Sequence, residues 1–371
     1  MSFIQAQNET DTFFLSKKKG WIGKLARSIT TTIPADTFSK TIIKNQEQYE
    51  RFAGYQINEI ELRQLGLGGS VNNPDTIRVT SLTKLADFFH KTTVSKVIYN
   101  NLFFREGDTV VPALLADNEK YLREQAYLED ARIIILPVSD AQKKVNIYVI
   151  TKDVFSIGGT VNVITPQSGE LTISEDNMVG SGNRIDVKSF YDNTRNNHLG
   201  SGADILKRNI GGSFIDFGAG YQTYNPAFNG GGREENIAYV NLNKNLVSAY
   251  DKWTLNLQYA YHGTENMYHK DSSYQNNYQY KYEDFDGWVG YNLGSAQKFN
   301  KKFSSRLRRL IGLRFVNHHF SEIPLQYLNN YNYQYANITG VLASYTFFQQ
   351  DFYKTKFIYG FGRNEDVPEG I

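Results

Sequence analysis

The segment 253–262 alternates between two kinds of side chain, and no other feature of the sequence restricts the fold as strongly. One set of alternate positions is apolar and aromatic, whereas the other is polar and almost uncharged. The two sets are Trp253, Leu255, Leu257, Tyr259 and Tyr261, and Thr254, Asn256, Gln258, Ala260 and His262. A repeat of two residues predicts a β-strand whose two faces meet different surroundings.

Similar alternation recurs from Phe155 to Gly362 and predicts about nine strands of roughly ten residues, the length that crosses an outer membrane at a tilt. The predicted strands are 155–163, 184–191, 215–222, 238–243, 251–263, 289–293, 311–318, 341–347 and 353–361. The connectors include the long segments 224–235, 264–286 and 321–337 and the shorter segments 244–252, 295–305 and 348–352. Such a pattern is typical of an up-and-down transmembrane β-barrel. A soluble β-sandwich is the alternative, but it does not require aromatic residues at both ends of each apolar face.

Composition agrees with alternating strands and excludes several classes of function. The 371 residues include 26 Tyr and 24 Phe, yet the mean hydropathy is −0.48. No run approaches the roughly 20 apolar residues of a transmembrane helix. The net charge of +2 argues against a nucleic-acid-binding protein, which would carry a basic surface. The absence of Cys excludes disulfides and Cys-ligated metals, and it suits passage through an oxidising periplasm.

Residues 1–48 are poorly patterned and are predicted to form an N-terminal arm. The first seven residues lack the basic region and apolar core of a secretory signal. Because a barrel protein must be exported, we expect that the chain is processed or that its true start lies elsewhere. The basic and apolar segment 17–25 is predicted to be a helix at the membrane surface, or else an extended arm that packs on the next domain or is disordered. Gly20 and Gly23 favour the extended arm, because glycine weakens a helix.

The pattern of residues 49–154 predicts a small α+β domain. We expect strands at 56–65, 131–138 and 144–153, a loop at 66–76 and a short helix at 82–90. A second short helix is predicted from the helical spacing of Val94, Val97, Ile98 and Leu102. The clearest helix has Asp108 or Thr109 as its cap and Pro112 in its first turn. Its apolar stripe comprises Leu114, Leu115, Tyr121, Leu122, Ala126 and Leu128.

Several motifs in this order resemble the BamA/TamA superfamily of outer-membrane insertases and translocases, particularly its Bacteroidetes branch. The motifs HKTT at 90–93, VIYNNLFFREGD at 97–108, EKYLR at 119–123 and Asp130-Ala131 resemble its POTRA domain. NMVGSGN at 177–183 resembles an early barrel hairpin, and FGRNEDVPEG at 361–370 resembles a stretch midway round the barrel. The resemblance covers residues 49–371. It implies a POTRA-like domain at 49–154, followed by a transmembrane barrel of antiparallel strands from 155 to 371.

The resemblance also implies a function. It predicts a protein of the bacterial outer membrane whose periplasmic domain binds unfolded clients and whose barrel inserts or exports them. The implied partners are unfolded outer-membrane or secreted proteins, membrane lipids and accessory lipoproteins, with no nucleic acid. A passive pore or a ligand-binding barrel with a structural periplasmic adaptor is the alternative. Family members have a longer barrel with a lid loop in its second half, so we expect this chain to be a fragment.

The candidate client-binding element is the strand 144–153, which is predicted to lie at a sheet edge. An edge strand offers backbone hydrogen bonds to an extended chain of any sequence. The residues assigned to this role are Val145, Ile147, Tyr148, Val149 and Ile150. An interior, fully paired strand is the alternative, because strand order cannot be deduced from the pattern.

No catalytic, cofactor or metal site is predicted, so the protein is not expected to be an enzyme. The Gly-rich segment 66–69 lacks the strand–loop–helix context of a phosphate site. His318 and His319 are neighbours on a predicted strand and point to opposite faces, so they cannot share one ion. The Gly-Ser-Gly segments 180–182 and 200–202 are interpreted as hairpin turns rather than nucleophile elbows.

Overall fold

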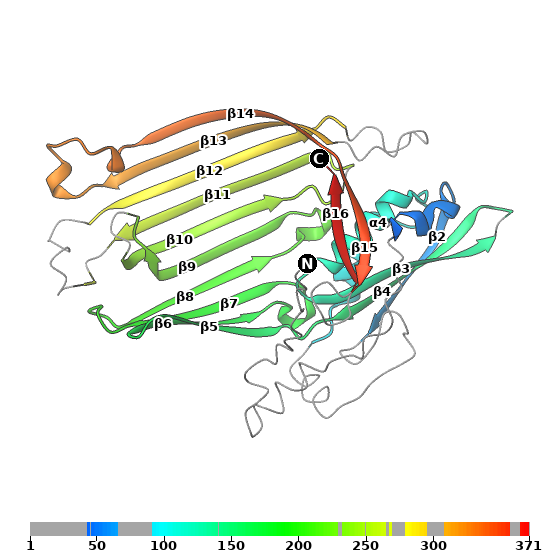
Figure 1. Ribbon diagram of the computed structural model, residues 1–371, viewed down its shortest axis with the longest axis horizontal. Helices are drawn as coiled ribbons and strands as arrows, with labels where there is room; N and C mark the ends of the chain where they lie inside the picture. The colour runs from blue at the N-terminus through cyan, green and yellow to red at the C-terminus, as the bar shows by residue number, and fades with distance from the viewer. Residues whose placement is uncertain are drawn as a thin grey trace, which may run out of the picture.

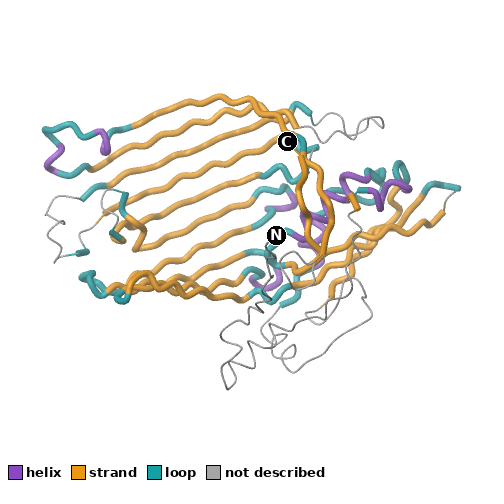
Figure 2. Tube along the Cα trace, in the orientation of Figure 1, coloured by secondary structure: helices purple, strands orange, loops and turns teal. Residues whose placement is uncertain are grey.

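The computed structural model shows an amino-terminal α+β domain at one end of a large antiparallel sheet (Figure 1). It describes residues 43–44, 46–65, 91–139, 141–228, 232–248, 250–264, 267–268, 279–294, 308–356 and 364–370. The chain is mostly β-structure, with short helices in and beside the domain and two more, η6 (Leu325–Tyr327) and η7 (Tyr333–Tyr335), at the opposite end of the sheet (Figure 2). The predicted loop at 66–76, the predicted helix at 82–90 and the segment 17–25 lie outside the described residues.

The amino-terminal domain (described residues 46–65, 91–139 and 141–153) packs two helices against a three-stranded sheet. Its elements are η2 (Glu47–Phe52), β2 (Gln56–Leu65), α3 (Ser95–Asn100), α4 (Pro112–Arg123), β3 (Leu128–Ser139) and β4 (Lys144–Asp153). The predicted strands 56–65 and 144–153 are confirmed residue for residue, and β4 is rich in β-branched side chains, which favour a strand. The sheet order is β2-β4-β3, with β2 parallel and β3 antiparallel to β4.

Helix α4 begins at Pro112, as its sequence predicts, but its cap differs from the prediction. Val111 occupies the cap position and offers no side-chain hydrogen bond to the helix. Asp108 instead accepts a hydrogen bond from the backbone N–H of Arg105 at 2.8 Å. The helix buries Leu115 and Leu122 completely against a sheet core that includes Ile147 and Val149. Leu128, expected on the helical stripe, starts strand β3.

The large sheet, called the wall below, contains ten strands in sequence order, each antiparallel to its neighbours. Its strands are β5 (Ile157–Thr165), β6 (Ser168–Glu175), β7 (Arg184–Asp192), β8 (Leu199–Lys207), β9 (Asp216–Pro226), β10 (Arg233–Lys244), β11 (Trp253–Thr264), β12 (Lys281–Asn292), β13 (Arg308–Glu322) and β14 (Ile338–Phe348). The sheet does not close on itself: within the described residues, β5 pairs only with β6 and β14 only with β13.

Eight of the predicted strands lie in the wall, but β6 and β8 were not predicted. The interpretation of Gly200–Gly202 as a turn is wrong, because both glycines lie inside β8. A Cβ atom at Gly200 would lie 2.7 Å from Tyr224, and one at Gly202 would lie 2.8 Å from Gln222. Glycine therefore allows β8 to lie under large side chains of β9 and does not mark a turn here. The other Gly-Ser-Gly segment, 180–182, does form a turn.

The described part of the predicted strand 353–361, residues 353–356, is not part of the wall, contrary to the prediction, and residues 357–361 lie outside the described residues. Strand β15 (Gln350–Lys356) pairs with β1 (Ile43–Lys44) and β16 (Asn364–Gly370) in a separate three-stranded sheet. Figure 1 shows this hairpin crossing from the end of β14 toward the amino-terminal domain. A period-two pattern specifies that a segment is a strand, but it does not specify which sheet the strand joins.

The two faces of the wall differ as the alternation predicts. On strand β11, Trp253, Leu257 and Tyr259 point outward and are between 39% and 51% exposed. Ala260 and His262 point to the other face and are buried. The outer face is apolar on every strand from β5 to β14, with Val163 as much as 74% exposed. Within the part of the chain that the structure describes, no helix combines the length and apolar character needed to cross a membrane.

Candidate functional site

Strand β4, the predicted client-binding edge, is the central strand of its sheet. Its residues pair on both sides: Ile147 lies opposite Ile60 of β2 and Ile135 of β3. The prediction that Val145, Ile147, Tyr148, Val149 and Ile150 form an edge is therefore wrong. Their backbone hydrogen bonds are used within the sheet, and the side chains of Val145, Ile147 and Val149 are fully buried. Strand β3 pairs with one side of β4 and β2 with the other, so neither side of β4 is open.

The outer side of β2 is covered by the loop that precedes α4. The backbone N–H of Ile57 donates to the Asp108 carbonyl at 2.9 Å, and Gly107 N–H donates to the Ile57 carbonyl at 2.8 Å. Further along, the N–H of Ile60 donates to the Glu106 carboxylate at 3.2 Å. These contacts satisfy the outward backbone groups along the first half of β2, so that half cannot accept an additional strand.

The outer side of β3 is blocked over its first half and open beyond it. The N–H of Ile133 donates to the Glu119 carboxylate at 2.7 Å, and the Ile133 carbonyl accepts from the Tyr49 hydroxyl at 3.2 Å. Alternation places the N–H and C=O of Ile135 on the same outer side. Among the described residues, neither group has a partner beyond β3. The neighbouring side chains of Leu136 and Val138 are 49% and 54% exposed, so this end is the candidate strand-binding edge.

Glu119 contacts several of the groups that cover the outer side of the first half of β3. Its side chain is 1% exposed and pairs with Arg123 at 2.6 Å, while it also accepts hydrogen bonds from Tyr49 and Ile133. Burial, followed by the adjacent negative charge of Glu119, raises the pKa of Tyr49 well above its ordinary value. Glu119 lies in the EKYLR motif, but its buried role could not be deduced, because Glu at a helix position is usually exposed.

The inner face of the wall carries charges that are paired between strands. Lys188 of β7 lies 2.5 Å from Asp204 of β8, and Asp204 also accepts a hydrogen bond from the Tyr239 hydroxyl at 2.5 Å. Arg233 of β10 pairs with Glu170 of β6 at 3.2 Å. These contacts place opposite charges on one face and leave the other face apolar. The inner face is therefore suited to water or polar chain segments rather than hydrocarbon.

Histidine and carboxylate side chains alternate across β10 to β13 on the inner face. His262 lies 2.6 Å from Glu235 and 3.8 Å from Asp284, and Asp284 is also hydrogen-bonded to His318. His318 faces Asp284, whereas His319 is exposed on the opposite face, as the strand alternation predicts. In the described part of the chain, no three such side chains converge on a position that could hold a metal ion.

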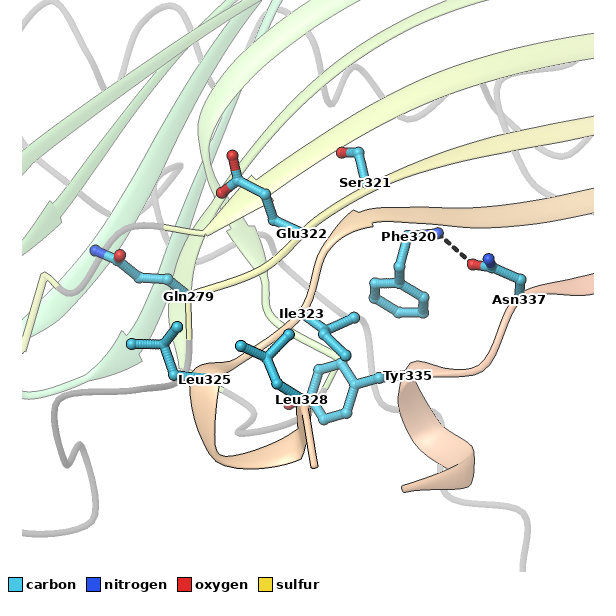
Figure 3. Close-up of a pocket in the computed structure, with 9 residues that line it drawn as sticks. All are labelled: Gln279, Phe320, Ser321, Glu322, Ile323, Leu325, Leu328, Tyr335 and Asn337. Atoms are coloured by element: carbon cyan, nitrogen blue, oxygen red, sulfur yellow. Dashed lines mark hydrogen bonds between the residues drawn. The ribbon is translucent and has the colours of Figure 1, made fainter. Parts of the chain in front are cut away.

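A cavity of about 580 Å³ lies at the end of the wall remote from the amino-terminal domain (Figure 3). Its lining residues are Gln279, Phe320, Ser321, Glu322, Ile323, Leu325, Leu328, Tyr335 and Asn337. Asn337 accepts a hydrogen bond from the N–H of Phe320 at 2.7 Å, which anchors the β13–β14 connector to the strand. Glu322 pairs with Lys281 at 2.6 Å, so the rim is balanced in charge. The cavity therefore offers an apolar floor and a neutral polar rim.

Neither a protein-family model nor a curated protein matches the sequence. Solved structures similar to this chain include BamA from Haemophilus ducreyi lacking POTRA domains 1–3, with 14% identity and a TM-score of 0.36 over 79% of this chain. CdiB from Acinetobacter baumannii shows 10% identity and a TM-score of 0.39 over 89% of the chain. CdiB from Escherichia coli shows 12% identity and a TM-score of 0.42 over 81%. This chain spans 56%, 57% and 54% of the lengths of these three structures, respectively.

Proposed function

We propose that the protein is an outer-membrane assembly or translocation factor with a POTRA-like domain in the periplasm. The observation that carries this proposal is the two-faced wall: ten antiparallel strands, apolar outside and charge-paired inside. In water, an apolar face of this extent would be buried against another layer. Val161, Val341 and Phe347 are instead between 67% and 73% exposed, which is appropriate for contact with hydrocarbon.

Client binding is therefore assigned to the open end of β3 and not to β4. A client segment in extended form would pair with the backbone of Ile135 and place apolar side chains beside Leu136 and Val138. Backbone pairing does not depend on client sequence, which suits a factor with many clients. Pro137 has no N–H and limits the paired length, so binding is weak and reversible, as delivery to the wall requires.

The proposal includes no catalytic step, cofactor or metal. Folding and burial of the client provide the free energy of insertion, and the apolar outer face of the wall contacts membrane lipids. The sequence resemblance adds accessory lipoproteins as partners. These roles rest on the motifs at 90–131 and 177–183 together with the geometry of the wall.

Depletion of the protein in its bacterium tests the proposal. We expect a broad loss of barrel proteins from the outer membrane and accumulation of their unfolded forms in the periplasm. Complementation with a Leu136→Asp, Val138→Asp variant should restore less of this loss than complementation with Glu50→Gln, a change at an exposed position elsewhere on the domain. An unchanged set of outer-membrane proteins after depletion would refute the assembly role.

A ligand-binding barrel is the second candidate, and the cavity beside Phe320 and Tyr335 favours it. Its volume lies in the range of small-molecule pockets. Under this alternative, depletion removes the uptake or surface binding of one ligand and leaves the other barrel proteins in place. A Leu325→Glu, Leu328→Glu variant would then reproduce the depletion phenotype, whereas the changes in β3 would not.

A further inference from the structure

Two turns at the domain end of the wall share a sequence motif and a conformation. The segments 177–183 and 209–215 both begin with Asn-x-x-Gly-Ser, and they follow β6 and β8, respectively. In each, the N–H of the second residue donates to the carbonyl of the seventh, from Met178 to Asn183 at 2.9 Å and from Ile210 to Ile215 at 2.8 Å. Such repetition on successive turns at one end of a sheet indicates a common role.

The asparagine of each turn supports its own backbone. The Asn177 side-chain oxygen accepts from the N–H of Gly182 at 2.8 Å, and the Asn209 oxygen accepts from the N–H of Phe214 at 2.7 Å. In each turn, the donor is the sixth residue and has a positive φ, 70° for Gly182 and 57° for Phe214. The serines also match, since Ser181 and Ser213 both donate to the carbonyl three residues earlier.

The amide nitrogens of the same two asparagines reach across to the amino-terminal domain. Asn177 donates to the Lys91 carbonyl at 3.2 Å and the Thr93 hydroxyl at 3.0 Å, just before helix α3. Asn209 donates to the Asn100 carbonyl at 3.1 Å and the Asn101 side-chain oxygen at 2.9 Å, where the helix ends. One turn therefore holds the start of α3 and the other holds its end.

These contacts are buried and continue into the domain. Asn177, Thr93 and Asn101 are between 1% and 2% exposed. Thr93 donates through its N–H and its hydroxyl to Asp153, at 2.7 and 3.0 Å, and Asp153 ends the strand that leads into the wall. Asn101 donates to the Tyr127 hydroxyl at 3.1 Å. Loss of a buried partner leaves polar groups without hydrogen bonds, so the network favours a single arrangement.

Phe214 shows that the second turn is shaped for the contact. A positive φ is unfavourable for a residue with a side chain, and the equivalent position in the first turn is glycine. The Phe214 ring packs edge-on against Phe103 and Tyr121 of the domain, with ring centroids 5.4 and 5.7 Å apart. This packing compensates for the unfavourable backbone conformation, which is retained where the surroundings impose it.

We propose that the twin turns lock the orientation of the amino-terminal domain relative to the wall, with Asn177 and Asn209 as the positioning residues. The residues 154–156, which connect β4 to β5, provide a third attachment between the same two bodies. The lock itself is independent of the function proposed above. Its consequence for client delivery, a fixed distance from the β3 edge to the wall, rests on that function.

Distances between two spin labels test the lock, and the absence of Cys allows labels at chosen positions. One label replaces Glu124, exposed at the end of α4, and the other replaces Tyr345, 61% exposed on β14. The full chain in lipid should give one narrow distance distribution. The Asn177→Asp, Asn209→Asp variant keeps both side-chain acceptors within the turns but loses both donors to the domain. Its distribution should be at least about two-fold broader, because the domain then samples several orientations.

Asn317→Asp is the control, because Asn317 donates an exposed 2.8 Å hydrogen bond to the Thr339 hydroxyl within the wall, away from the domain. The Asn317→Asp variant should leave the width of the distance distribution unchanged. If the double variant does not fold, the two single Asn→Asp variants replace it under the same criterion. A native distribution as broad as that of the variant, or variants as narrow as the native protein, would overturn the lock. A narrow native distribution combined with no assembly defect after depletion would refute the proposed function alone.

Discussion

The Tyr49 hydroxyl donates a 2.7 Å hydrogen bond to Glu119 and joins η2 to α4 across 70 residues of sequence. Replacement of Glu119 by Ala removes this bond and also the 2.6 Å ion pair with Arg123, in which the two side chains are only 1% and 4% exposed. We expect the domain to lose about 3–5 kcal/mol of stability, the usual cost of breaking a buried pair. Hydrogen exchange of the β3 and α4 amides in the full chain measures this loss.

Glu124→Ala is the control for this change, because Glu124 forms an ion pair of the same spacing with Lys120 on the same helix. The Glu124 side chain is 56% exposed, so its loss should cost less than about 1 kcal/mol. Equal effects of the two substitutions would show that burial of Glu119 has no energetic consequence.

The raised pKa of Tyr49 predicts a dependence of domain stability on alkaline pH. Burial and the charge of Glu119 favour the protonated hydroxyl in the folded state. The contribution of Tyr49 is therefore complete below its unfolded pKa of about 10 and is lost as the pH rises above that value. Unfolding followed by the helical circular dichroism signal at about pH 8 and about pH 11 should show this loss.

Tyr49→Phe should be less stable than the native chain at neutral pH but lose less stability at alkaline pH. The control is Tyr331→Phe, because Tyr331 is 86% exposed on the β13–β14 connector. The Tyr331→Phe variant should lose as much stability between about pH 8 and about pH 11 as the native chain does. If Tyr49→Phe and the native chain lost the same stability with rising pH, the alkaline pH dependence could not be assigned to Tyr49.

Replacing either of two glycines on the inner face of β9 by alanine should change the stability of the wall in different ways. Gly220 lies beneath the hydrogen bond between Asp204 and Tyr239, and a Cβ there would overlap Asp204 and lie 2.5 Å from the tyrosine ring. There is room for a Cβ at Gly218, because the nearest atom to it would be the Asn241 Cβ at 3.8 Å. Gly220→Ala should destabilise the wall by about 1–3 kcal/mol. Gly218→Ala should leave stability unchanged or slightly higher, as measured by urea unfolding in lipid.

The orientation of β11 predicts how the wall responds to an added charge. Leu257 lies on the apolar outer face and Gln258 on the inner face, and both side chains are exposed. If hydrocarbon covers the outer face, Leu257→Arg should cost about 2–4 kcal/mol in the equilibrium between urea-unfolded and bilayer-inserted protein. Gln258→Arg should cost much less. Equal costs would contradict the placement of lipid on the outer side.

The elements that could be predicted were those with strong local patterns. Strands β2 and β4 have the bounds that their sequences predict, and the outward set of β11 is the set that the alternation identifies. Strand β8 was missed because its inner positions include Gly200 and Gly202, which carry no side chain to reveal the alternation. Their function as space for Tyr224 and Gln222 depends on a neighbouring strand.

Alternation between residues 157 and 348 was sufficient to predict a wall with an apolar and a polar face, because each strand position carries the chemistry of its surroundings. The order of strands in the domain sheet, the partners of β15 and the convergence of Asn177 and Asn209 on α3 were decided only by the folded arrangement. Hydrogen bonds between backbones have no sequence code, so a strand pattern does not identify its neighbour. Contacts between distant segments become visible only after the chain has brought them together.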